Sequence, residues 1–284
     1  MAEGNSIINL GDWSKPVNTF IEKIANAVGI LYEPKRIIKK AKAEALADEI
    51  KEINKLHLDD LKKRAIQRLL NEETLKQNNI ENIIEKTIPL INDSSNAEIL
   101  NDDWLSNFFD KSKLVSDSNM QILWSKILAG ETNNPGSFSK FTLKIISELE
   151  EKDAKLFTLM GSSTFIIGNP TPVIFISEDE NRMKYELNGI SFEGLTHLET
   201  IGLIKFNSLS GFARLKLPKI FNVIYFNYPI KLEMQNETEN RLNIGNILLT
   251  QAGKELINIC GAIPNSELRQ LALDKWKKEG IVIH

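Results

Sequence analysis

No glycine and no proline occurs between Pro34 and Pro89, and this stretch without helix breakers constrains the fold more than any other feature of the sequence. Strong helix formers fill its first part, so we predict one long helix over residues 35–70. Residues 71–79 are a polar interruption, and apolar residues return at helical spacing over residues 80–91. The polar run at residues 92–96 is typical of a loop.

An amphipathic segment precedes this stretch. Apolar residues recur there at helical spacing and form a narrow stripe, namely Val17, Phe20, Ile21, Ile24 and Val28. We predict that this stripe is the interface of a homo-oligomer. Packing of the stripe on the long helix of the same chain is the alternative.

The same segment also has features of a membrane-surface helix. Five cations follow it: Lys35, Arg36, Lys39, Lys40 and Lys42. An apolar face with cations beside it suits anionic head groups. Carboxylates at Glu22, Glu33 and Glu44 dilute the basic face. We therefore disfavour a membrane partner.

The helical pattern continues over residues 97–160. A dense apolar face around Trp124 belongs to a helix that Ser116 or Asp117 can cap. We expect this helix to end at Gly130, because glycine is common just after the last helical turn.

The spacing changes in the C-terminal part of the chain. β-Branched runs at residues 164–167 and 173–176 predict strands, and residues 191–202 return to helical spacing. Residues 203–206 and 212–217 flank a polar turn and predict a β-hairpin. Further strands and a helix are expected over residues 220–228, 230–234, 246–249 and 250–259.

These patterns predict an α+β protein that is mainly α. Long N-terminal helices occupy a first domain, residues 1–96, and a helical bundle occupies residues 97–160. A winged-helix-like α/β module occupies residues 161–284.

Composition excludes several classes of protein. The formal net charge is -3 and the pI about 5.8, which excludes a polybasic nucleic-acid coat protein. Cys260 is the only cysteine, so a disulfide-stapled secreted domain is excluded. We see no signal peptide and no apolar run long enough to cross a bilayer, and we expect a cytoplasmic protein.

The motifs of common enzymes are missing. Residues 130–137 superficially resemble a phosphate-binding loop but lack its lysine. A catalytic pair of Cys260 and His197 would need folding to bring two separate helices together. Acidic clusters at residues 102–103 and 178–180 fit capping or solvation better than acid–base chemistry. We therefore expect no enzyme, no cofactor and no metal site.

Nucleic-acid binding is the main alternative. The predicted helix, strand and hairpin look like the second half of a winged-helix unit, whose helix reads the major groove of DNA. Residues 191–202 contain no lysine or arginine, and their carboxylates would repel phosphate. The candidate DNA contacts are therefore on the predicted hairpin: Lys205, Arg214, Lys216 and Lys219.

Several stretches carry a family resemblance: residues 29–34 with 41–45, residues 123–131, and residues 135–140. They resemble an uncharacterised bacterial family with a domain of unknown function. More distantly, the helical half is similar to abortive-infection proteins of the Abi-alpha type. The resemblance implies a role in phage defence and brings no catalytic residues.

We therefore predict a non-enzymatic intracellular interaction protein, homo-oligomeric and of the phage-defence type. Its expected partners are a second copy of itself and a phage protein or DNA. A winged-helix DNA-binding regulator is the alternative function.

Overall fold

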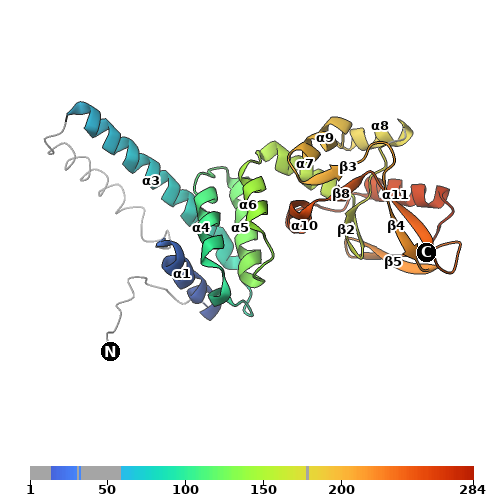
Figure 1. Cartoon of the computed structure of the whole chain (residues 1–284), viewed down its shortest axis with the longest axis horizontal. Coiled ribbons are helices and arrows are strands. Elements are labelled where there is room, and N and C mark those ends of the chain that lie inside the picture. Colours follow the sequence, from blue (N-terminus) through green and yellow to red (C-terminus); the bar gives the residue numbers. More distant parts are fainter. Residues whose placement is uncertain (1–13, 31, 33–58, 177–178) are drawn as a thin grey trace. The chain divides into compact units, whose positions relative to one another are not determined.

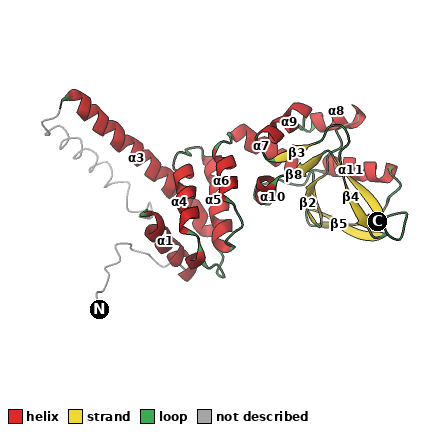
Figure 2. Ribbon diagram, viewed as in Figure 1, coloured by secondary structure: helices red, strands yellow, loops and turns green. Residues whose placement is uncertain are grey.

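The computed structural model describes residues 14–30, 32, 59–176 and 179–284. Its architecture is α+β, with helices and antiparallel sheets (Figures 1 and 2). The chain forms two compact units, and the boundary between them lies between Leu143 and Lys144. The described elements of the first unit are helical, whereas strands β1 to β9 all belong to the second. The finer division into three domains stays a prediction.

The described helices of the first unit cover most of its length. They are α1 (Lys15–Val28), α3 (Asp60–Thr87), η1 (Ile88–Leu90), η2 (Ala97–Ile99), α4 (Asp102–Ser112), α5 (Ser118–Asn133) and α6 (Lys140–Ser147), which crosses the unit boundary.

Helix α3 runs without a break through residues 71–79, so the predicted polar interruption is wrong. Side chains one turn apart support the helix there: Arg68 pairs with Glu72 at 2.8 Å, and Gln67 donates to Asn71 at 3.1 Å. A polar stretch of good helix formers thus stays helical on an exposed face. Residues 35–58 of the predicted long helix lie outside the described residues.

Helix α5 begins as predicted and ends later than predicted. The side chain of Asp117 accepts a hydrogen bond from the backbone N–H of Met120 and caps the helix. The helix then passes through Gly130 to Asn133. Gly130 makes room for a ring, since a Cβ there would lie 2.7 Å from the side chain of Phe138.

Aromatic side chains form the core of the first unit. The ring centroid of Phe108 lies 5.2 Å from that of Trp104 and 5.2 Å from that of Trp124. All three residues are buried, and α5 also packs on α3. Trp124 is therefore a core residue, as expected for an aromatic at the centre of an apolar helix face.

The described residues of the second unit form both helices and strands. Its helices are α7 (Glu151–Gly161), α8 (Asp179–Leu187), α9 (Phe192–Thr200), α10 (Gln251–Ile257) and α11 (Ser266–Lys278). Its strands are β1 (Thr164–Ile167), β2 (Asn169–Pro172), β3 (Ile204–Phe206), β4 (Phe212–Leu217), β5 (Ile220–Tyr225), β6 (Tyr228–Glu233), β7 (Asn240–Gly245), β8 (Ile247–Leu249) and β9 (Val282–Ile283).

The described strands form one five-stranded antiparallel sheet, in the order β2-β1-β5-β6-β9, and two strand pairs, β3–β8 and β4–β7. The hairpin predicted from residues 203–206 and 212–217 is therefore wrong, although both of its strands exist. The backbone of Asn207, just after β3, donates to the carbonyl of Asn246 at 2.9 Å. This bond helps direct β3 to β8, so residues 208–245 form an insertion between the two paired strands.

The strand predicted over residues 173–176 is also wrong. Gly168 adopts a φ of 74° and makes a tight turn, so β2 begins directly after it, at Asn169. Strand β2 ends at Pro172, which is opposite Thr164, the first residue of β1. The predicted residues form only a single parallel bridge, between Ile174 and Gly245.

The two faces of the five-stranded sheet differ. The inner face is buried against α11, where the ring centroid of Phe165 lies 5.2 Å from that of Trp276. The outer face carries exposed side chains in the alternate positions, including Ile166, Ile220 and Ile224. The core of the second unit thus lies on one side of this sheet.

Candidate interaction surfaces

The predicted oligomer stripe lies inside the first unit. Val17, Phe20, Ile21 and Ile24 are buried, and Val28 is half-buried. Helix α1 packs on α4 and η2 of the same chain, so the stripe leaves no exposed surface for a second copy. The stripe therefore packs within its own chain, as the alternative prediction held, but it packs on α4 and η2 and not on the predicted long helix. An interface between copies must therefore be sought elsewhere.

The four predicted DNA contacts do not gather on one hairpin. Lys205 is exposed on β3, whereas Arg214 is half-buried and Lys216 is exposed on β4, in another strand pair. Lys219 follows β4 and pairs with Glu237 at 2.9 Å. Lys205 therefore belongs to the β3–β8 pair, whereas the other three residues lie on or just after β4, which pairs with β7.

Two short helices precede the β3–β8 pair in the chain. Helices α8 and α9 are joined by four residues, in which Gly189 has a φ of 78°. Ser191 caps α9 by accepting from the backbone N–H of Gly194 at 3.0 Å, and β3 follows and pairs with β8. The sequence of α9 contains no lysine or arginine, and Glu193 is exposed on it.

Helix α9 is tied to α7 by one polar contact. His197 Nε2 lies 2.8 Å from Oδ1 of Asp153, a buried residue near the start of α7. Burial alone would raise the pKa of Asp153, but the backbone N–H of Glu150 and the side chain of His197 outweigh it and lower that pKa. The Asp153–His197 hydrogen bond therefore links α7 to α9 and is strongest when Asp153 is ionised.

The Cys260 and His197 pair is not brought together. Cys260 lies beside Gly161 at the end of α7, and its carbonyl accepts from Thr158 at 2.8 Å. His197 contacts Asp153 instead, eight residues earlier on α7, or about 12 Å along a helix. Among the described residues, no group of three or more His, Cys, Asp or Glu side chains is placed to hold a metal ion.

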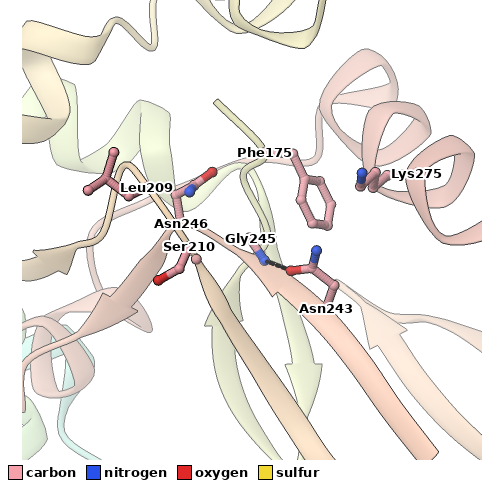
Figure 3. Close-up of a pocket in the computed structure, with 8 residues that line it drawn as sticks. Phe175, Leu209, Ser210, Asn243, Gly245, Asn246 and Lys275 are labelled. Atoms are coloured by element: carbon pink, nitrogen blue, oxygen red, sulfur yellow. Dashed lines mark hydrogen bonds between the residues drawn. The ribbon is translucent and has the colours of Figure 1, made fainter. Parts of the chain in front are cut away.

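A small polar hollow of about 70 Å³ lies at the base of the insertion (Figure 3). Asn246 and Asn207 are hydrogen-bonded there: the Asn246 Nδ2 donates to the Asn207 backbone carbonyl at 2.7 Å. On the opposite wall, the Lys275 ammonium lies 5.9 Å from the ring centroid of Phe175. The polar groups around the hollow therefore contact other residues of the same unit. These contacts help hold the base of the insertion, residues 208–245, in place.

A larger apolar groove of about 480 Å³ opens between the outer face of the sheet and the end of α10. Ile166 and Ile224 are cross-strand neighbours on its floor and are 36% and 40% exposed. Ile257 and Ala262 line it from α10 and the following loop, and Phe226 lines it from the β5–β6 turn. Among the surfaces described, this groove is the best candidate for binding an apolar partner.

The sequence contained a signal for this groove. Strand β5 reads Ile-Phe-Asn-Val-Ile-Tyr, so it carries large apolar residues at both odd and even positions. Such a strand has an apolar residue on each face of its sheet. The partner strand β1 shows the same pattern, because Ile166 lies between the buried residues Phe165 and Ile167.

Helix α8 carries a second exposed apolar surface. Met183 and Leu187 lie one turn apart and are 67% and 82% exposed. Tyr185, between them in the sequence, points into the unit and is fully buried. Helix α8 thus buries Tyr185 and presents two large apolar side chains outward.

Residues 63–272 match the DUF2806 family, which is described as a protein of unknown function. The chain belongs to this family. The family region contains the groove, α8 and most of α3, whereas α1 and its stripe lie outside it. No curated protein and no solved structure matches the chain, so the comparisons provide no link to abortive-infection proteins. Within the described residues, no helix is both long and apolar enough to span a membrane.

Proposed function

We propose that this protein acts by binding other protein chains, including a second copy of itself, and not by catalysis. The observation that carries the proposal is the uncovered apolar groove between the sheet and α10. Monomeric proteins expose few contiguous apolar surfaces of this kind, and those that they expose are commonly binding sites.

The construction of the groove supports a binding role. Its floor is a cross-strand pair, Ile166 and Ile224, held in register by the sheet. Its walls carry Asn227 and Asn258, which give the apolar floor a polar border. An apolar centre with a polar rim is the usual anatomy of a protein interface.

Light scattering on the full chain during gel filtration tests the proposal. Over a concentration series that reaches about 100 μM, where contacts of about 5 kcal/mol populate a complex, we expect a mass that rises above the 32.2 kDa of one chain. A constant mass of one chain over the whole series contradicts self-association.

The biological setting is proposed from sequence resemblance alone. Residues 123–131 and 135–140 resemble a family that is distantly similar to Abi-alpha-type proteins, which supports a role in phage defence. Plaque counts on cells with and without the gene test this setting. Equal counts for a broad set of phages contradict it.

A second candidate function is DNA binding. The order of two helices joined by four residues, α8 and α9, and then the β3–β8 pair supports this proposal. If α9 and its neighbours contact DNA, the exposed cations Lys205 and Lys216 supply the phosphate contacts, and the double change to Glu lowers the salt dependence of binding. Fluorescence anisotropy with a labelled duplex at low salt tests this. No binding removes the candidate.

A further inference from the structure

The N-terminal part of α3 lies outside the core of the first unit. All buried residues of this helix lie between Asn79 and Thr87, and its earlier turns extend beyond α4 and α5 (Figure 1). Three leucines on these turns are exposed: Leu61 at 69%, Leu69 at 55% and Leu75 at 56%. At about 3.6 residues a turn they lie within an arc of about 120° of the helix surface. This leucine face (Leu61, Leu69 and Leu75) is apolar surface of the kind that marks interaction sites.

The charges beside the leucine face are unevenly distributed along the helix. Four cations occupy its first turns and two glutamates follow them: Lys62, Lys63, Arg64 and Arg68, and then Glu72 and Glu73. Two parallel copies of α3 would align the basic turns with each other, and like charges side by side repel. Two antiparallel copies bring the basic turns of each helix against the glutamates of the other. The charge pattern therefore selects a second copy of the same helix, in antiparallel orientation.

A two-fold axis at Arg68 matches both the leucines and the charges. About this axis Leu61 faces Leu75 of the other copy, because each lies seven residues from Arg68. The same symmetry pairs opposite charges at three positions: Arg64 with Glu72, Lys63 with Glu73, and Asp60 with Lys76. Arg68 faces itself, but its side chain pairs with Glu72 of its own helix at 2.8 Å, which offsets the repulsion.

We propose that the leucine face of α3 is the contact of an antiparallel pair of copies. Both copies use the same surface, so the contact is isologous and closes with two chains. It extends over residues 61–75, about 21 Å of helix. The exposed ion pairs that border it contribute little each. We therefore expect the groove contact to be needed for a stable complex below about 100 μM, so this inference rests on the proposed self-association and adds a second surface to it.

Site-specific cross-linking tests the register of the pair. Each variant is made in a Cys260→Ala chain, so that the introduced cysteine is the only one. At about 100 μM with a short bis-maleimide, Arg68→Cys should give a two-chain product, because residue 68 lies at the axis. Leu61→Cys and Leu75→Cys should each give little product alone, since each lies about 21 Å from its own copy. Their mixture should give the product.

The two leucine variants alone are the matched controls, because Leu61 and Leu75 are exposed on the same face of the same helix. A product from each of them as strong as that from Arg68→Cys contradicts the antiparallel register. Circular dichroism shows whether each variant folds. The mixture of the two leucine variants keeps Arg68, so its result does not depend on a change at the axis.

A charge exchange tests the pairing independently. Arg64→Glu places a glutamate opposite Glu72 at both ends of the pair, so we expect it to weaken self-association about threefold or more in sedimentation velocity. The double variant of Arg64→Glu with Glu72→Arg exchanges the two charges and should restore most of the wild-type assembly. The effect of the single variant should shrink at high salt, because exposed charges are screened. A double variant that assembles no better than Arg64→Glu contradicts the pairing.

The outcomes separate this inference from the proposed function. A wild type that self-associates, while no cysteine variant gives a product, overturns the α3 contact and leaves the proposed function standing. A wild type that stays a single chain, while Arg68→Cys gives the product and the controls do not, supports the α3 contact and contradicts binding through the groove. A wild type that stays a single chain, with no product from any variant, overturns both proposals.

Discussion

Replacing Glu131 by glutamine should destabilise the first unit by about 2 kcal/mol, because a hydrogen bond to a charged group contributes about 1.5–3 kcal/mol. Glu131 is buried on the last turn of α5. Its Oε1 accepts from the backbone N–H of Gly136 at 2.7 Å, and its Oε2 accepts from the N–H of Phe138 at 2.9 Å. One carboxylate thus fixes the loop between α5 and α6.

A glutamine keeps one acceptor oxygen and puts an NH2 group where the other oxygen was. One backbone N–H of the loop then faces a donor and loses its partner, which costs about 1–3 kcal/mol when the group is buried. Glu131→Ala removes both acceptors and should cost more than Glu131→Gln. The loop also holds the carbonyl of Phe138, which accepts from Trp104 Nε1 at 2.7 Å, so loosening it reaches the aromatic core.

Urea unfolding followed by tryptophan fluorescence measures the change. The matched control is Glu98→Gln, because Glu98 is exposed in the same unit and its loss of charge should alter stability by less than about 0.5 kcal/mol. The midpoint should fall for Glu131→Gln with an unchanged slope. If the two variants unfold at the same urea concentration, the argument that this carboxylate holds the loop is refuted.

Three further changes test other parts of the structure. Gly245→Ala places a Cβ 2.1 Å from the Ile174 carbonyl oxygen at a φ of 88°, so we expect a loss of at least about 2 kcal/mol in urea unfolding. Because the pKa of Asp153 is lowered in the folded state, its ionised form stabilises the fold above the ordinary value near pH 4, and this stabilisation is lost as pH falls through the folded pKa. Asp153→Asn should therefore lessen the loss of stability at acid pH, as measured by acid unfolding. Burial, and then Glu85 and Glu81, raise the pKa of Tyr32 to about 12, so stability falls as pH rises above the ordinary value of 10, and Tyr32→Phe should lessen that fall in alkaline urea titrations.

The local parts of the fold followed from the sequence. Asp117 and Ser191 are short polar side chains just before apolar helical spacing, and each caps the helix that was expected there. The exception at Gly130 has a non-local cause. Gly130 has no side chain, so the ring of Phe138, eight residues on, packs against it, whereas the local pattern predicts only the more common role of a helix end.

The pairing of strands did not follow from the sequence. Strands β3 and β4 are neighbours in the chain and favour a hairpin, yet β3 pairs with β8 across an insertion of about forty residues. The contacts that decide this pairing, such as those of Asn207 with Asn246, join residues far apart in sequence. No local pattern carries that information.

The candidate site was missed for the same reason. Three segments line the groove: the end of α7 with β1, the β5–β6 turn, and the residues at and after the end of α10. The first two are separated by about sixty residues of sequence, and the second and third by about thirty. The apolar stripe of α1 was locally conspicuous and attracted the interface prediction, but the chain covers it with α4 and η2. Spacing identifies an apolar face and does not say which element covers it.

Sedimentation equilibrium of the wild type beside Ile224→Glu tests the central claim, that the apolar groove binds another copy of the chain. Up to about 100 μM, the wild type should show a mass that rises with concentration, while the variant keeps the 32.2 kDa of one chain. Two curves that coincide, either both at the mass of one chain or both rising together, would contradict binding through the groove.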